Sequence, residues 1–203
     1  MVKLYLAKIP NIEIKNVFCK ERNDEILSCS LFSVKKEKYF VWKLLEFVLE
    51  KEFNLDYKKV KFYKNPIGTW ACNTIKFSLS HSHDYVAVAV SEKEVGVDVQ
   101  KVVNVCKRVI EKVVRASEIP ENLDEMAKKE FAIKLWSVKE SIFKQNPIKN
   151  RSVLSTDING ANVVTFKIPI DNDIYYLSAC TENLENANYV LLEPTEFIKF
   201  CIK

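Results

Sequence analysis

Three short stretches of the chain carry residue types that suit phosphate chemistry. One is a serine and histidine run at 78–83, which holds both histidines of the chain, His81 and His83. The others are Val-Gly-Val-Asp-Val at 95–99 and Trp-Ser-Val-Lys-Glu-Ser at 136–141. Magnesium takes oxygen ligands, often one or two carboxylates together with substrate phosphates. Together the three stretches indicate an enzyme that handles a phosphate-rich substrate through a divalent metal.

Two carboxylates, Asp98 and Glu140, are the candidate metal ligands. Because side chains alternate along a strand, the valines of 95–99 should face a core while Gly96 and Asp98 face a cleft. An incidental bulge or turn explains a lone glycine nearly as well. Glu140 is expected on a helix, where it could equally form a plain salt bridge with Lys144, four residues later. Strand and helix allow the two carboxylates to converge, and two separate surface carboxylates are the alternative.

The histidines suit phosphate binding better than metal binding or nucleophilic catalysis. His81 and His83 should share one face of a strand, and an imidazole beside small hydroxyl residues can bind a phosphate oxygen. A structural histidine is the alternative for each. Zinc is disfavoured because the chain has no third histidine and no Cys-x-x-Cys pair. Ser80 and His81 lie on opposite strand faces without a nucleophile-elbow motif, which argues against a serine-hydrolase triad.

Hydrophobic periodicity predicts the elements that must position these side chains. A period of about 3.6 residues predicts amphipathic helices, whereas alternation predicts strands, including an antiparallel meander near the C-terminus. The predicted elements are an edge strand at 2–7, a helix at 36–53, an irregular connection at 65–69, strands at 75–79, 85–90 and 95–99, helices at 105–115 and 123–145, and meander strands at 162–170, 174–181 and 189–193.

The composition is that of an ordinary globular protein. Of 203 residues, 48% are hydrophobic and 29% are charged, and no apolar stretch approaches the ~18 residues of a membrane span. Only three glycines occur, which excludes a glycine-rich phosphate loop. The net charge of +4 is spread along the chain, so it fits an acidic small molecule or protein and does not indicate nucleic-acid binding. We expect a cytoplasmic protein without a membrane segment or secretory signal.

The ordered set of motifs at 77–82, 95–99 and 136–144 closely resembles the surfactin-synthetase-activating (Sfp) type of 4′-phosphopantetheinyl transferases. The resemblance implies an α/β fold that is a pseudo-dimer of two similar helix-and-antiparallel-sheet sub-domains with the active cleft between them. Residues 1–100 would form the N-terminal sub-domain on the coenzyme A side. Residues 101–203 would form the C-terminal sub-domain, with the Trp-Ser-Val-Lys-Glu-Ser helix and the meander.

The resemblance also implies an activity. Such enzymes transfer 4′-phosphopantetheine from coenzyme A to a serine of an apo acyl or peptidyl carrier protein, and release 3′,5′-ADP in a magnesium-dependent reaction. By position, Asp98 and Glu140 would bind magnesium, and Glu140 would take the proton of the carrier serine directly or through water. Lys144 would neutralise charge on the phosphate under attack. Phosphoryl transfer depends mainly on such positioning and charge neutralisation.

Five residues are the expected coenzyme A contacts. His81, with Ser80 beside it, would hold the 3′-phosphate. Lys139 would support the helix that carries the third motif. Lys43 and Lys64 would stand in the place of basic residues that the family has farther upstream.

The chain departs from the family pattern at Gln100, where a second acidic residue is common. The amide oxygen of Gln100 can still face the metal, but it carries no charge, so metal affinity should be lower. A non-catalytic relative that binds coenzyme A or a carrier protein is therefore the alternative, and a basic nucleic-acid-binding protein is a third. A pseudo-dimer within one chain can complete its cleft as a monomer, which is the oligomeric state we expect.

Overall fold

A computed structural model of the chain describes residues 1–114, 118, 120, 123–149 and 152–203. This part of the chain is mixed α/β, with five helices and three sheets. The helices are α1 (Lys20–Leu27), α2 (Phe32–Phe53), α3 (Lys107–Val113), α4 (Glu125–Gln145) and α5 (Pro194–Ile202). The strands are β1 (Lys3–Lys8), β2 (Phe62–Lys64), β3 (Trp70–Cys72), β4 (Lys76–Ser82), β5 (Tyr85–Ser91), β6 (Val95–Lys101), β7 (Val163–Ile170), β8 (Asp173–Thr181) and β9 (Tyr189–Leu192).

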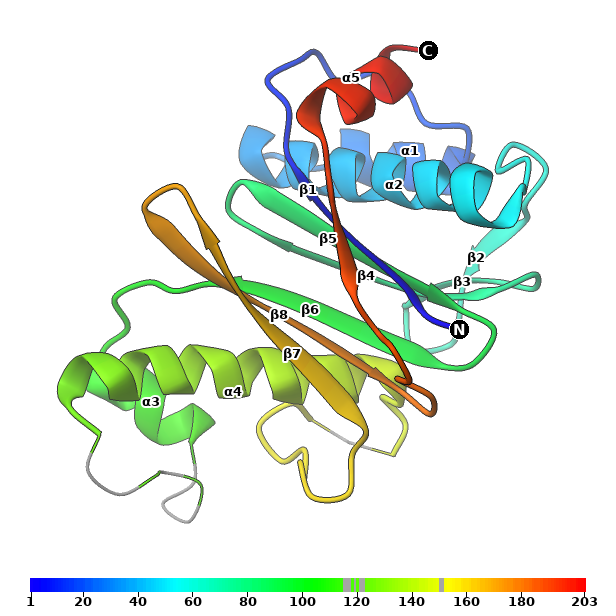
Figure 1. Ribbon diagram of the computed structural model, residues 1–203. Coiled ribbons are helices and arrows are strands. Elements are labelled where there is room, and N and C mark those ends of the chain that lie inside the picture. Colours follow the sequence, from blue (N-terminus) through cyan, green and yellow to red (C-terminus); the bar gives the residue numbers. More distant parts are fainter. Residues whose placement is uncertain (115–117, 119, 121–122, 150–151) are drawn as a thin grey trace.

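The elements stack in layers (Figure 1). Helix α2 covers one face of a four-stranded sheet with the order β4-β5-β1-β9. The opposite face of that sheet packs on a three-stranded sheet with the order β6-β8-β7. Helix α4 covers the outer face of this second sheet (Figure 1). The two long helices therefore lie outside two sheets that face each other.

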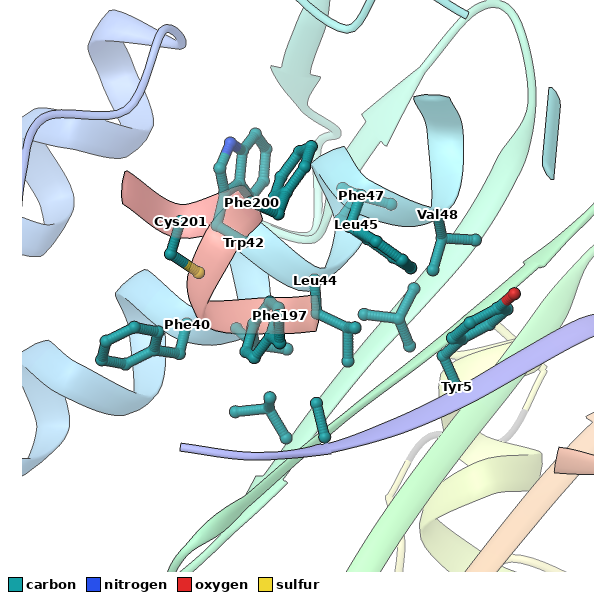
Figure 2. Close-up of a cluster of buried hydrophobic side chains, with 14 of the residues drawn as sticks. Tyr5, Phe40, Trp42, Leu44, Leu45, Phe47, Val48, Phe197, Phe200 and Cys201 are labelled. Atoms are coloured by element: carbon teal, nitrogen blue, oxygen red, sulfur yellow. The ribbon is translucent and has the colours of Figure 1, made fainter. Parts of the chain in front are cut away.

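Helix α2 forms because its apolar positions supply much of the first core. Phe40, Leu44 and Phe47 of α2 gather with Phe197 and Phe200 of α5 (Figure 2). The helix ends where Asn54 takes a left-handed conformation, with φ of 50°. Asparagine is one of the few residues that adopt this conformation readily, so it is a natural helix stop.

The valines of β6 face the space between the sheets, as their alternation predicts. Val95, Val97 and Val99 are buried there against Leu4 and Leu6 of β1. The other members of this core include Tyr85, Ala87 and Ala89 of β5 and Tyr175, Leu177 and Ala179 of β8. Gly96 and Asp98 consequently point to the outer face of the sheet, which α4 covers.

Gly96 allows α4 to lie directly on β6. A Cβ atom at this position would overlap the backbone of Ser141 and Gln145 on α4. The helix begins at a regular cap, in which the Asp124 side chain accepts a hydrogen bond from the amide of Ala127. The glycine thus serves close packing of strand and helix, and it brings the backbone of α4 next to the strand that carries Asp98.

Serine side chains join the two sheets where β4 runs beside β6. The backbone amides of Val97, Val99 and Lys101 donate to the Oγ atoms of serines on β4, at 3.0, 3.2 and 3.0 Å. The acceptors are Ser78, Ser80 and Ser82, in that order. Within one sheet, the backbone carbonyls of a neighbouring strand would accept these hydrogen bonds. Here the serine hydroxyls at alternate positions of β4 accept them instead. The first motif at 78–83 is in this way tied to the second at 95–99.

Several predicted elements need correction. The strand at 2–7 is not an edge strand, because β1 lies between β5 and β9. The run at 189–193 does not continue a meander, since β9 pairs in parallel with β1 in the other sheet. His83 does not lie on the strand, but in the turn after β4 with φ of 54°. Among the described residues, no helix is both long and apolar enough to cross a membrane.

Candidate functional site

An open pocket of about 370 Å³ lies where α1, α2, β3 and β4 meet the end of α4. Several predicted site residues line it, together with residues that the sequence patterns did not single out. The lining side chains that carry charge or a hydrogen-bonding group at this pocket are Arg22, Lys38, Thr69, Trp70, Ser78, His81, Glu140 and Lys144.

Asp98 is held beneath this pocket by three side chains. Its Oδ1 accepts hydrogen bonds from Ser80 Oγ and from Lys144 Nζ, each at 2.7 Å. Its Oδ2 accepts one from Gln100 Nε2 at 3.0 Å. The carboxylate is 2% exposed and is not among the lining residues of the pocket, and the Lys144 ammonium is its charge partner. Gln100 turns its amide nitrogen to Asp98, whereas its amide oxygen is the atom expected from the sequence to face the metal.

Glu140 completes the carboxylate pair around one cation. Its Oε2 lies 3.7 Å from Lys144 Nζ, so the ammonium of Lys144 is shared between Asp98 and Glu140. Burial raises the pKa of Glu140 above its ordinary value, the charge of Asp98 raises it further, and Lys144 partly opposes both. A carboxylate with a raised pKa is a stronger base than an ordinary glutamate, which suits proton abstraction.

Ser137 fixes α4 to the strands beneath this pair. Its Oγ is fully buried and donates to the carbonyl oxygen of Asp98 at 3.1 Å. It also lies 3.0 Å from Ser178 Oγ, which lies 3.0 Å from Thr165 Oγ1 on β7. This hydroxyl network sets the height of α4 over the sheet, and with it the positions of Glu140 and Lys144 relative to Asp98.

His81 lines the same pocket and pairs with an acid on α2. Its Nδ1 lies 3.3 Å from Glu37 Oε2. Partial burial lowers the pKa of His81, as does the charge of Lys144, while Glu37 opposes the change. The imidazole is therefore more readily neutral than an ordinary histidine, and it presents a hydrogen-bonding group to the pocket.

Lys139 and Lys43 do not line this pocket. Lys139 is fully buried on the α3 side of α4, where Nζ donates to the carbonyl oxygen of Val113 at 2.7 Å and to Glu118 Oε2 at 3.0 Å. Lys43 pairs with Glu46 at 2.6 Å. It lines a different cavity of about 390 Å³ between α2 and α5. Within the stretch 115–122, the structure describes only Glu118 and residue 120.

Lys64 belongs to a cationic cluster that the sequence patterns missed. Its Nζ lies 3.3 Å from Glu25 Oε2. Glu25 also contacts Lys38 at 2.9 Å, Arg22 at 3.2 Å and Trp70 Nε1 at 2.8 Å. Helix α1, which carries Arg22 and Glu25, has few apolar residues and no predicted start signal, so periodicity does not reveal it.

The side chains here have the ligand chemistry that magnesium prefers, but they do not form a complete set of metal ligands. Asp98 and Glu140 offer carboxylate oxygens, and they already share one positive charge, the Lys144 ammonium. Over the described ranges, no three His, Cys, Asp or Glu side chains are grouped so that they could hold a metal ion. Magnesium commonly binds through one or two carboxylates plus substrate phosphates. A metal here would therefore need oxygen ligands from its substrate or from water.

Comparison with known proteins leaves the family unassigned. No protein-family model matches the chain, and no curated protein matches its sequence.

Proposed function

We propose that this protein transfers 4′-phosphopantetheine from coenzyme A to a serine of an apo acyl or peptidyl carrier protein. The observation that carries the proposal is the meeting of three separate motifs in one network. Ser80 of the first motif and Asp98 of the second share a hydrogen bond, and Lys144 of the third contacts both. Glu140 lies beside them with its pKa raised. Residues 18 to 64 positions apart thus supply two carboxylates, an ammonium and a hydroxyl to one place.

The proposed reaction exchanges one phosphorus–oxygen bond for another. The carrier serine Oγ attacks the phosphorus that bears the pantetheine arm, and a bond to that oxygen forms. The bond from this phosphorus to the bridging oxygen of the diphosphate breaks, and 3′,5′-ADP leaves with the bridging oxygen. The serine proton passes to Glu140, directly or through one water. Atoms and charge balance without an oxidant or a covalent enzyme intermediate.

The residues of the pocket divide these tasks. Glu140 accepts the proton, because its raised pKa makes it a stronger base than an ordinary glutamate. Lys144, whose side chain is 27% exposed, can turn its ammonium from Asp98 to a phosphate in the pocket. His81 faces the pocket as a hydrogen-bonding group for the 3′-phosphate. Ser80 holds the carboxylate of Asp98 in place.

Asp98 and Glu140 would hold the magnesium ion, and Gln100 would orient Asp98 from behind. When bound, the ion supplies charge neutralisation at the diphosphate of coenzyme A. Lys139 supports the helix from its buried pair with Glu118, and we leave Lys43 out of the coenzyme site because it lines another cavity.

The layered fold is compatible with a pseudo-dimer that works as a monomer in the cytoplasm. Each long helix packs on one sheet, and the pocket lies where elements of both halves meet. The positive balance of the chain, +4, would suit an acidic carrier protein.

A non-catalytic relative that binds coenzyme A or a carrier protein is the second candidate. It is favoured by Gln100, whose amide nitrogen occupies one oxygen of Asp98 where an acidic residue would repel it. Such a protein would bind coenzyme A but release no 3′,5′-ADP. The variant Gln100→Glu adds a charge beside Asp98 and should tighten magnesium binding if residue 100 lies near the ion.

Intact mass of a panel of apo carrier proteins tests the proposal. Each carrier is incubated with this protein, coenzyme A and magnesium, with a chelator in a parallel reaction. We expect one carrier or more to gain a single phosphopantetheine, and the gain to disappear with the chelator. Coenzyme A binding without any gain in mass would support the non-catalytic candidate. No binding of coenzyme A would refute the transfer reaction, and no binding of coenzyme A or of any carrier protein would refute both candidates.

A further inference from the structure

Glu25 is the meeting point of four donors at the α1 and α2 wall of the pocket. Its Oε1 accepts from Lys38 at 2.9 Å, and its Oε2 lies 2.8 Å from Trp70 Nε1, 3.2 Å from Arg22 and 3.3 Å from Lys64. A carboxylate has about four lone-pair sites. Glu25 is therefore saturated with donors, three of which are cations from different elements.

The surroundings keep Glu25 ionised. Burial would raise its pKa, but hydrogen bonds from Lys38 and Trp70 and the charge of Arg22 outweigh burial and lower the pKa to about 2. Three cations, Arg22, Lys38 and Lys64, face this single anion. The cluster thus has a surplus of two positive charges, which matches the charge of a phosphate monoester near neutral pH.

The partners of Glu25, and not Glu25 itself, line the pocket. Arg22, Lys38 and Trp70 are lining residues. Arg22 is 4% exposed, and its Nε has no hydrogen-bond partner within the described residues. It is also fixed in orientation, because its guanidinium lies 5.2 Å from the Trp42 ring centre and donates to the carbonyl oxygen of Lys38 at 2.8 Å. A buried guanidinium with an unused donor beside a pocket needs an acceptor.

We propose that Glu25 is a positioning residue for substrate binding, which holds Arg22 and Lys38 at the pocket wall so that they take the phosphate monoester of coenzyme A. Glu25 lies behind these cations and stays in place when the phosphate binds, since moving it would leave Trp70 Nε1 and Arg22 without their acceptor. The inference rests on the proposed function, because it assumes coenzyme A as the ligand. It adds that one wall of the pocket selects ligands that carry a doubly charged phosphate.

Binding of two ligands by the full chain tests this role. Isothermal titration compares coenzyme A with 3′-dephospho-coenzyme A, which lacks the monoester, for the wild type and for Glu25→Gln. We expect Glu25→Gln to weaken coenzyme A binding about tenfold, as for the loss of one charge-assisted contact. Binding of the dephosphorylated ligand should change less than about twofold, because it makes no contact that depends on Arg22 and Lys38.

Two further variants keep the test decisive. Glu21→Gln makes the same charge change at an exposed position of α1 and should leave both affinities as in the wild type. If Glu25→Gln does not fold, Lys38→Met replaces it, since Lys38 is partly exposed and should show the same preference for weakening coenzyme A. Equal weakening for both ligands, or tighter coenzyme A binding in Glu25→Gln, would overturn the inference while leaving the proposed function standing. Failure of the wild type to bind coenzyme A would refute the proposed function and the inference with it.

Discussion

Asp98 and Glu140 are two carboxylates beside one ammonium, in unequal surroundings. Asp98 accepts three side-chain hydrogen bonds and is 2% exposed. Within the described part of the chain, the charge partner of Glu140 is Lys144 at 3.7 Å, and the Glu140 side chain is 19% exposed. A carboxylate with many donors is fixed, whereas one with a weak partner can change its protonation state at lower cost. In the proposed reaction Glu140 would therefore be the proton acceptor, and Asp98 would hold position and charge.

Replacing Glu140 by glutamine should remove the base without changing the shape of the side chain. We expect Glu140→Gln to lower the transfer rate by about 100-fold or more. In the wild type the rate should fall as pH decreases through the pKa of Glu140, because the protonated acid accepts no proton. Burial raises that pKa above its ordinary value, which moves the acid limb to higher pH than for an ordinary glutamate. The rate of carrier modification as a function of pH measures this limb.

The matched control for this prediction is Glu125→Gln. Glu125 lies on the same helix but is 77% exposed, so its loss should leave the rate and its pH profile unchanged. A Glu140→Gln protein that keeps both the rate and the acid limb of the wild type would show that another group takes the proton.

At the residue scale, spacing predicts which side chains meet better than it predicts which way each one faces. The helical spacing of four pairs Glu140 with Lys144, and the strand alternation allows Asp98 to converge with them. In the structure the carboxylates of Asp98 and Glu140 lie 2.7 and 3.7 Å from the Lys144 ammonium. Lys139 precedes Glu140 by one residue and is turned about 100° around the helix, so it faces α3. Lys43 lies on the α2 face that packs toward α5. A sequence motif names neighbours in the chain, not the side of the helix on which each lies.

Strands β4 and β6 are joined by hydrogen bonds to serine hydroxyls. Substitutions of these serines can distinguish an effect on stability from an effect on activity. Ser80 and Ser82 each accept a β6 amide, at 3.2 and 3.0 Å, but only Ser80 also contacts Asp98. We expect Ser80→Ala and Ser82→Ala each to lower the free energy of unfolding by about 1–3 kcal/mol, since each leaves a buried amide unpaired. Only Ser80→Ala should also lower the transfer rate.

Urea unfolding and carrier modification of the two variants measure these effects. Ser82→Ala is the control for the loss of stability that follows from removing one hydrogen bond between β4 and β6. Equal loss of transfer rate in both variants would mean that the hydrogen bonds between β4 and β6, and not the Ser80–Asp98 contact, set the activity.

Close contact of α4 with β6 depends on Gly96. The variant Gly96→Ala adds a Cβ atom that overlaps the backbone of Ser141 and Gln145, and backbone cannot rotate away as a side chain can. We expect a loss of about 3 kcal/mol or more in the free energy of unfolding, measured by urea denaturation. For comparison, Gly160→Ala has open space around it but a φ of 72°, and should cost only about 1 kcal/mol. Equal costs for the two variants would show that α4 can move away from β6.

At the element scale, hydrophobic periodicity predicts the helices and strands that bury one face and expose the other. Helices α2 and α4 and strands β4, β5 and β6 fall where the pattern places them, within a few residues. Pairing partners are a different matter, because a six-residue alternating strand has the same pattern at an edge as in the middle of a sheet. This is why β1 was predicted at an edge, and why the parallel pairing of β9 with β1 is absent from the sequence argument.

At the scale of the molecule, the chain crosses between the layers twice. After β5 the chain leaves the first sheet, and the next strand, β6 (95–101), pairs with β8 in the other sheet. Strand β9 and helix α5, near the C-terminus, return to pair with β1 and to pack on α2. The first core is therefore built from both ends of the chain, so a division at residue 100 does not separate the cores. Sequence patterns predict a helix and strands in each half of the chain, but they do not predict that the C-terminal segment packs back on the first core.

The return of the C-terminal segment predicts that both layers unfold together. Phe197 of α5 is 1% exposed and packs in the first core beside Phe40 (Figure 2). We expect Phe197→Ala to lower the free energy of unfolding by about 3–5 kcal/mol. Because β1 and β5 have one face in each core, loss of packing around α2 should also release β6 and α4. Pulsed hydrogen exchange across a urea series, read for α2 and α4 separately, measures the two midpoints.

The two midpoints should coincide in the wild type and shift together in Phe197→Ala, as expected for one cooperative unit. Ile202→Ala, at a 53% exposed position of the same helix, should leave both midpoints in place. If α4 kept its midpoint while α2 unfolded earlier, the layers would be independently stable. The pocket would then open by separation of its walls, since Arg22 and Lys38 belong to one layer and Glu140 and Lys144 to the other. A single transition instead means that the geometry of the pocket is as stable as the whole fold, and that the motifs stay aligned until the molecule unfolds.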